Sequence, residues 1–422
     1  MATAEASHAH DHDHPEWLAH HFESPEQQFD AGKLGMWLFL AQEVLFFSGL
    51  FVAYSVFRAN HPEVFTEEAL SFLNPLLGAL NTIVLLASSL AVAWGVRAAQ
   101  KNQQSTLLWM HIFTLACAGF FMGVKVVEYG FKFDENLYWA GWANWSNGLH
   151  SAEEHLTNTG IHTHFMSITG VCIAIGLLAY LGGLSLYRSG DKSLLGRLLV
   201  IASGFIVCVL GGYVVAAILN AYPGVATNVT AVVSAFILMG VLHLFVKIIG
   251  TTSKVWGAVC MGLGLTVLGM AGGVVVASGI QQSEVDSHAA HAADAAHAEG
   301  AHEENHAEHG AAAEPAGHEP AEATAEVAAA AATPTSEDTA ASHVLGGRGA
   351  NEGNFFSIYF AMTGVHALHI LAGIAAISWI VGRIARGDFG PERYGPVEYV
   401  GLYWHLVDLV WIYLFPLLYL VH

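Results

Sequence analysis

The sequence places ionisable side chains inside apolar segments, and these residues need a chemical explanation. The 24-residue run Leu34 to Phe57 carries one charged residue, Glu43. At about 1.5 Å of rise per residue, such a run can cross a bilayer core of about 30 Å. A carboxyl group at that depth is costly to expose to lipid, so we expect Glu43 to face protein or water and to be paired or protonated. A functional role and a purely structural tie between helices are both open for it.

Two later apolar runs, TGVHALH and YWHLVDLVWIY, each contain a pair of polar residues three positions apart. The pairs are His366 with His369 and His405 with Asp408. Residues three apart share a helix face. With Glu43 they make three imidazoles and two carboxylates, which suit Fe, Cu or Zn, so an intramembrane metal site is one interpretation. The other is a hydrogen-bond network between helices, with two tryptophans packed beside it, Trp404 and Trp411.

A third polar pair, Lys125 and Glu128, is also three residues apart, near the end of an apolar run. Side chains at this spacing can form an ion pair on one helix face. We interpret it as an interfacial pair whose lysine extends, or snorkels, toward water.

The elements that position these residues are long apolar helices. Of the 422 residues, 54% are hydrophobic and 12% are charged, against roughly 25% charged in soluble domains. The predicted membrane-spanning segments are 34–57, 73–96, 106–130, 165–187, 198–222, 229–249, 255–280, 355–381 and 397–421. Asn74 followed by Pro75 is typical of a helix start. The sequence therefore predicts an all-α polytopic membrane helix bundle of about nine transmembrane helices.

The net charge of −20 is concentrated outside these helices, because residues 281–352 hold fourteen acids and one arginine. No basic stripe is present, which makes nucleic acid an unlikely partner class. Residues 1–32 and 281–352 are rich in histidine. Such tracts are solvated tails more often than defined metal sites, although metal binding is an alternative for both.

Composition divides the chain into six predicted segments. They are a polar His-rich cytoplasmic tail (1–32), three core helices (33–133), an external aromatic and polar loop (134–164), a four-helix membrane segment (165–280), a disordered acidic His- and Ala-rich external linker (281–352) and the last two helices (353–422). With a cytoplasmic N-terminus, eleven of the fifteen Lys and Arg residues lie on the cytoplasmic side and the C-terminus lies outside.

Five runs of the sequence closely resemble subunit III of the haem-copper oxidases, specifically cytochrome c oxidase. They are Ala41–Tyr54, Leu73–Ser88, the KVVEY of Lys125–Tyr129, Thr363–His369 and Tyr403–Phe415. The resemblance covers the first three and the last two predicted spans, roughly 170 residues. Relative to the family, the first two of seven helices are absent, and residues 165–352 form an insert of four helices and the linker.

The resemblance implies a subunit without haem or copper of its own, in a bacterial plasma-membrane complex that pumps protons and reduces O2 to water. It implies direct contact with subunit I, association with subunit II and other respiratory subunits, phospholipid binding, and support of assembly and proton uptake. Glu43 matches the family's intramembrane carboxylate. The residues that match family packing and hydrogen-bonding positions are His366, His369, His405 and Asp408. On this basis we expect Glu43 to lie between the first and eighth spans, within hydrogen-bonding reach of a histidine.

Two alternatives remain from the sequence. One is subunit III of a quinol oxidase or nitric oxide reductase relative, which shares the fold. The other is a metal-dependent membrane enzyme or transporter that uses the HxxH motif and the His-rich segments. A third possibility is that the chain is a subunit III that acts only as a scaffold and has no influence on turnover.

Overall fold

The computed structural model describes residues 18–62, 65, 73–134, 159–219, 253–307 and 350–420. Its helices are α1 (Pro25–Asn60), α3 (Pro75–Gln100), α4 (Gln104–Asp134), α6 (Thr159–Ser189), the short 3₁₀ helix η2 (Gly190–Lys192), α7 (Leu194–Leu219), α9 (Ser253–Ala307), α11 (Ala350–Arg386) and α12 (Gly395–Tyr419). Seven of them are long and apolar enough to span a membrane, namely α1, α3, α4, α6, α9, α11 and α12. The chain is therefore a multi-pass, all-α membrane protein, as predicted. The predicted span 198–222 falls mostly on α7, in which Leu194–Leu210 is a shorter apolar helix that is not among the seven. The predicted span 229–249 lies outside the described residues, so the total of nine stays a prediction.

Local sequence signals explain where two of these helices begin. Ser24 caps α1 by accepting a hydrogen bond from the Gln27 amide, and Pro25 occupies the first helical position. Asn74 caps α3 by accepting from the amides of Leu76 and Leu77 at 2.8 and 3.2 Å. Each cap satisfies amide groups that have no partner within the helix. The predicted start of α3 is thus confirmed.

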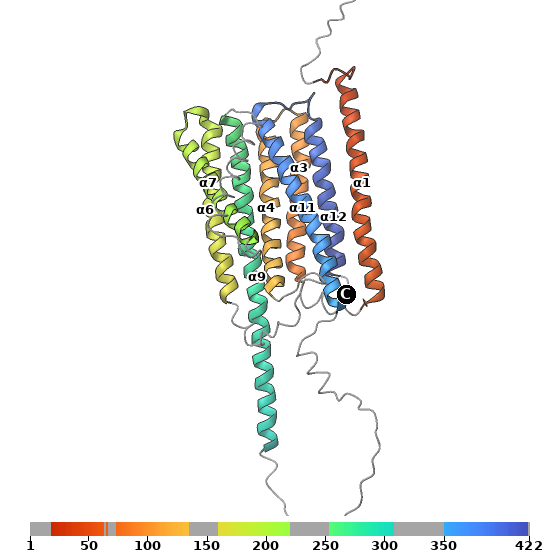
Figure 1. The fold of residues 1–422 in the computed structure, drawn as a ribbon, viewed down its shortest axis with the longest axis vertical. Coiled ribbons are helices and arrows are strands. Elements are labelled where there is room, and N and C mark those ends of the chain that lie inside the picture. The colour runs from red at the N-terminus through yellow and green to blue at the C-terminus, as the bar shows by residue number, and fades with distance from the viewer. Residues whose placement is uncertain are drawn as a thin grey trace, which may run out of the picture.

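The spanning helices stand side by side, with α1 at one edge of the bundle and α6 and α7 at the opposite edge (Figure 1). α1 packs on α12 and α11, and α12 packs on α3. α9 lies between α6 and α4 and also contacts α11. The segment that we interpret as an insert, which includes α6, α7 and α9, therefore packs on α4 through α9 and lies across the bundle from α1.

Glycine brings α9 into backbone contact with α4. A Cβ atom at Gly123 of α4 would lie 2.1 Å from the carbonyl oxygen of Met270 in α9. A Cβ atom at Gly269 of α9 would lie 2.1 Å from the carbonyl oxygen of Ala116 in α4. Both distances are too short for any other residue type, and such close small-residue contacts are common between membrane helices. α9 is consequently a fixed part of the bundle.

The linker prediction is wrong for its first 27 residues, 281–307, because α9 continues through them to Ala307. Figure 1 shows this extension projecting beyond the ends of the neighbouring helices. Alanine has the highest helix propensity, and it recurs throughout this stretch. Residues 308–349 lie outside the described part of the chain.

The outer face of α1 is strongly apolar. Leu34, Leu38, Leu45 and Val52 are each more than 60% exposed. Since α1 occupies an edge of the bundle, these side chains suit contact with lipid acyl chains or with another membrane protein.

Candidate functional site

Glu43 lies in the middle of α1 and contacts α11 through His369. Its Oε2 atom lies 3.0 Å from His369 Nε2. Only 8% of Glu43 is exposed. The expectation that Glu43 is buried between the first and eighth predicted spans, within reach of a histidine, is confirmed.

The hydrogen bonds of His369 determine how many protons this pair holds. His369 Nδ1 lies 2.8 Å from the carbonyl oxygen of Val365, one turn earlier in α11. A carbonyl oxygen only accepts, so Nδ1 carries a proton. Nε2 then either accepts a hydrogen bond from protonated Glu43 or donates one to ionised Glu43. In both arrangements the pair shares one proton and is neutral, which suits its depth in the membrane.

Aromatic rings surround the pair. The rings of Phe47 and Phe46 lie 5.0 and 6.4 Å from the His369 ring, centroid to centroid. Tyr403 of α12 donates a hydrogen bond to the carbonyl oxygen of His369 at 2.9 Å. The side chains of His369 and Glu43 nevertheless keep 19% and 11% exposure. The pair therefore lies at the edge of the bundle, held by α11 and α12 but partly open to its surroundings.

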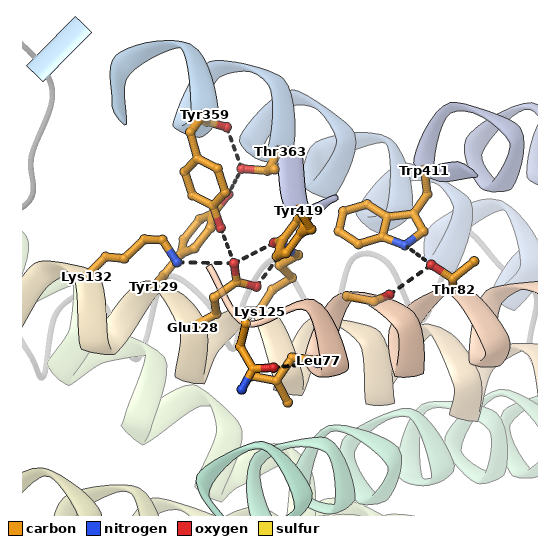
Figure 2. A network of polar contacts seen from close by, with 12 residues as sticks. Leu77, Thr82, Lys125, Glu128, Tyr129, Lys132, Tyr359, Thr363, Trp411 and Tyr419 are labelled. Atoms are coloured by element: carbon orange, nitrogen blue, oxygen red, sulfur yellow. Dashed lines mark hydrogen bonds and ion pairs between the residues drawn. The ribbon is translucent and has the colours of Figure 1, made fainter. Parts of the chain in front are cut away.

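Glu128, near the C-terminal end of α4, accepts four hydrogen bonds (Figure 2). Lys125 Nζ donates to Oε2 at 2.7 Å, and Lys132 Nζ donates to Oε1 at 3.2 Å. The hydroxyl groups of Tyr359 in α11 and Tyr419 in α12 both donate to Oε1 at 2.5 Å. The three charged residues are only 2–4% exposed. This carboxylate is thus buried and paired with donors from three helices.

Lys125 is enclosed by the protein. Its Nζ also donates to the Tyr419 hydroxyl at 2.6 Å and lies 4.5 Å from the centroid of the Trp411 ring, a cation–π contact. The predicted ion pair with Glu128 is present. Its interpretation as an interfacial pair whose lysine reaches water is wrong, because α11 and α12 cover this end of α4.

Tyr129 extends the same network along α11. The Tyr129 hydroxyl lies 2.6 Å from Thr363 Oγ1. The Thr363 hydroxyl in turn donates to the carbonyl oxygen of Tyr359 at 2.7 Å. Figure 2 shows both contacts beside Glu128. The Glu–Tyr element of the KVVEY run therefore binds one helix through two different side chains.

Three hydrogen bonds join α12 to α3. Ser89 Oγ donates to Asp408 Oδ2 at 2.6 Å. Trp404 Nε1 donates to Ser88 Oγ at 2.9 Å. Trp411 Nε1 donates to the hydroxyl of Thr82 at 3.0 Å. Both tryptophans are fully buried, so they pack and donate hydrogen bonds at the same time.

The structure disperses the two polar pairs of the last two helices. His369 meets Glu43, whereas His366 stacks on Trp411 with ring centroids 5.4 Å apart. Asp408 bonds to α3, and half-buried His405 has no hydrogen-bond partner in the described part of the chain. No group of three or more His, Cys, Asp or Glu residues converges among the described residues. A shared helix face therefore did not bring these side chains to one site.

Several buried polar atoms have no hydrogen-bond partner among the described residues. They include both amide atoms of Asn81, both ring nitrogens of His366, Asp408 Oδ1 and His111 Nε2.

Sequence reasoning missed some of the residues that contact the predicted acids. Lys132 had a local signal, because it follows Glu128 by four residues and so lies on the same helix face. Tyr359, Tyr419 and Ser89 had none, since they come from helices distant in the sequence.

Comparison with known proteins matches both ends of the chain. A family model described as cytochrome c oxidase subunit III matches residues 19–181 and 342–422, more than half of the sequence. The first block ends within α6, so it includes part of the segment that we assign to the insert. The matched blocks contain every residue of the Glu43–His369 pair and of the Glu128 cluster.

Individual relatives align over shorter regions. The chain is 35% identical over 79 residues to a haem-copper oxidase subunit I+III of Aeropyrum pernix, covering 18% of this chain and 10% of that protein. It is 37% identical over 76 residues to a cytochrome c oxidase subunit 3 of Thermostichus vulcanus, covering 18% and 38%. It is 40% identical over 65 residues to the corresponding protein of Corynebacterium diphtheriae, covering 15% and 32%. No solved structure matches the chain significantly.

Proposed function

Because this chain belongs to the cytochrome c oxidase subunit III family, we propose that it is the non-redox subunit III of a proton-pumping cytochrome c oxidase. In this role the holoenzyme reduces O2 to water with electrons from cytochrome c. The chain supports assembly, the stability of subunit I, lipid binding and proton uptake. The observation that carries the protonic part of the proposal is the 3.0 Å contact between the Glu43 carboxyl and the His369 imidazole at the edge of the bundle.

The proposed direct partner is subunit I, with subunit II and other respiratory subunits in the same complex. The Aeropyrum relative is named a subunit I+III protein, so in that protein the two subunits are one chain. The exposed apolar face of α1, beside the Glu43 pair, is the surface that we assign to such a membrane partner. Phospholipid is a further proposed ligand of the outer surface.

We assign haem and copper to the other subunits. In support, the candidate ligands on this chain are directed to different protein groups: His369 to Glu43, Asp408 to Ser89 and His366 to Trp411. The proposed location is the bacterial plasma membrane, with the N-terminus cytoplasmic and the C-terminus and linker outside. That orientation rests on the distribution of Lys and Arg residues.

Purification of the tagged chain from native membranes tests the assignment. We expect it to copurify with a haem-containing subunit I and with a subunit that carries a copper-binding cysteine pair, and the complex to oxidise reduced cytochrome c with consumption of O2. A complex without the copper subunit that oxidises quinol would instead support the quinol oxidase alternative. Copurification without any haem protein would overturn the proposal.

A second measurement separates a role in turnover from a pure scaffold. Removal of the chain from the purified complex should accelerate the loss of oxidase activity during turnover. If the depleted complex loses activity at the same rate as the intact one, the chain is a scaffold without influence on the catalytic centre.

A further inference from the structure

The turn between α6 and α7 has a defined shape. Ser193 Oγ accepts a hydrogen bond from the amide of Gly196 at 3.0 Å, which caps the start of α7, and it lies 2.6 Å from the hydroxyl of Ser185 in α6. Gly190 adopts a φ of +58°, which glycine tolerates without strain. A Cβ atom at Gly182 of α6 would lie only 2.8 Å from a side-chain atom of Leu199 in α7. The two helices are therefore held close together, and the turn fixes where its side chains lie.

Basic side chains gather at this turn. Lys254, at the start of α9, lies with its Nζ 5.5 Å from the centroid of the ring of Tyr187 in α6, so the charge from α9 is placed beside the turn. Against these bases the turn sequence holds one acid, Asp191, which leaves an excess of positive charge. All four basic residues are exposed, and together we call them the basic turn: Arg188, Lys192, Arg197 and Lys254.

Large apolar side chains form an exposed row on α7 that begins at the basic turn. They follow one another at intervals of four, three and four residues, the spacing of a single helix face. α7 lies at the edge of the bundle, where it packs on α6 (Figure 1). Each member of this apolar row is 55–66% exposed: Leu194, Leu198, Ile201 and Phe205.

The dimensions of the two features match those of a phospholipid. The apolar row extends over eleven residues, or about 16 Å along the helix. This is close to the thickness of one leaflet, since the whole hydrocarbon core measures about 30 Å. Arg197 follows Leu194 by three residues and precedes Ile201 by four, so it borders the row on the helix surface. A lipid whose acyl chains lie along the row would therefore have its headgroup at the basic turn.

The charge at this end of the helix distinguishes the α7 surface from the apolar face of α1. Lys33, near the start of α1, lies 2.8 Å from Glu398 and is thereby neutralised. The basic turn instead keeps its excess of exposed positive charge beside its apolar row. Clusters of basic residues next to a membrane helix attract anionic lipids. A headgroup with a net negative charge complements the basic turn better than a zwitterionic one.

We propose that the basic turn and the apolar row together bind an anionic phospholipid, with its phosphate group at the basic turn and an acyl chain along α7. The proposal deepens the proposed phospholipid binding by giving the lipid a location and a headgroup charge. It rests on the membrane location of the chain and not on the oxidase role.

Photocrosslinking of the native complex in lipid vesicles tests this site. The probes are phosphatidylglycerol and phosphatidylcholine that carry the same photoreactive group on one acyl chain, and mass spectrometry quantifies the label on residues 194–205. Each basic residue near an anionic surface strengthens binding about fivefold. We therefore expect the phosphatidylglycerol probe to label this segment at least about fivefold more than the phosphatidylcholine probe. Equal labelling by the two probes would overturn the proposal, and so would the absence of label that a covering protein subunit would cause.

Two double variants show whether the basic turn is responsible. Lys192→Gln/Arg197→Gln should lower labelling by phosphatidylglycerol about fivefold for each charge removed, toward the level of phosphatidylcholine. The control is Arg97→Gln/Lys101→Gln, which removes two exposed bases from the end of α3 and should leave labelling unchanged. Lys192→Arg/Arg197→Lys keeps both charges and should retain the preference. A basic-turn variant that labels like the wild type, or a control that loses as much label, would contradict the proposal whether or not the complex is an active oxidase.

Discussion

Glu43 and Glu128 are both glutamates within membrane-spanning helices, yet their surroundings differ in almost every respect. Among the described residues, Glu43 has one hydrogen-bond partner, a histidine, and it lies at the edge of the bundle. Glu128 has four donors from three helices and lies beneath α11 and α12. Two of its four donors are lysines, so its ionised form is neutralised within the cluster.

This difference shows that depth in the membrane does not by itself define the role of an acid. The Glu128 carboxylate is held by fixed positive charges, and its protonation would leave two buried lysines without a counter-ion. The Glu43 carboxyl is hydrogen-bonded to one imidazole and is held by no lysine or arginine among the described residues. The first arrangement is tied to three helices by fixed charges, whereas the second depends on a single contact between α1 and α11.

The largest effect is expected from Glu128→Gln. The substitution keeps the side-chain size but leaves Lys125 and Lys132 buried without an anion, which destabilises by about 3–5 kcal/mol. We expect a strong loss of assembled protein, measured by size-exclusion chromatography and thermal unfolding in detergent. Glu392→Gln is the control, because Glu392 is exposed in the α11–α12 loop. Wild-type stability of the Glu128 variant would show that the cluster is not a structural lock.

An intermediate effect is expected from Tyr359→Phe and Tyr419→Phe. Each removes one hydrogen bond to a charged acceptor, worth about 1.5–3 kcal/mol, while Lys125 and Lys132 still neutralise the carboxylate. Tyr419→Phe also removes the hydrogen bond that Lys125 donates to the Tyr419 hydroxyl, so it should cost more than Tyr359→Phe. Thermal unfolding of the two single variants and the double variant measures the effect. Tyr413→Phe on α12, where the tyrosine is 58% exposed, should be neutral. Neutral behaviour of both buried variants would mean that the lysines alone hold Glu128.

The comparison also shows what the sequence could predict. The burial and pairing of Glu43 followed from its depth in an apolar run, and the Lys125–Glu128 pair followed from helical spacing. The other partners of Glu128 could not be predicted, because Tyr359 and Tyr419 lie 231 and 291 residues away along the chain. Which helix ends meet is decided by packing across the whole bundle, including the glycine contacts of α9 with α4.

The histidine pairs illustrate a further limit. A spacing of three residues places His366 and His369 about 60° apart around α11, since each residue turns the helix by about 100°. In a crowded bundle that angle is enough to direct them to different neighbours, Trp411 and Glu43. The spacing indicated a common face correctly, but it could not determine a common site.

A small effect on stability is expected from Tyr403→Phe, which acts on the Glu43 side of the comparison. The substitution removes one neutral hydrogen bond to the His369 carbonyl oxygen, worth about 0.5–1.5 kcal/mol. The bond positions the backbone of His369 and takes no part in proton sharing. Thermal unfolding should show a shift smaller than that of Tyr359→Phe. A larger shift would mean that the edge of the bundle is as tightly held as its interior.

The smallest effect on stability, and the sharpest contrast with Glu128→Gln, is expected from Glu43→Gln. Because Nδ1 of His369 keeps its proton and donates a hydrogen bond to the Val365 carbonyl oxygen, Nε2 can accept a hydrogen bond from the new amide. The contact between α1 and α11 is then retained, and unfolding should change by less than about 0.5 kcal/mol. The amide cannot release a proton, so proton uptake during turnover of the complex should slow if the pair serves that path. Equal losses of assembly in Glu43→Gln and Glu128→Gln would show that both acids are structural ties.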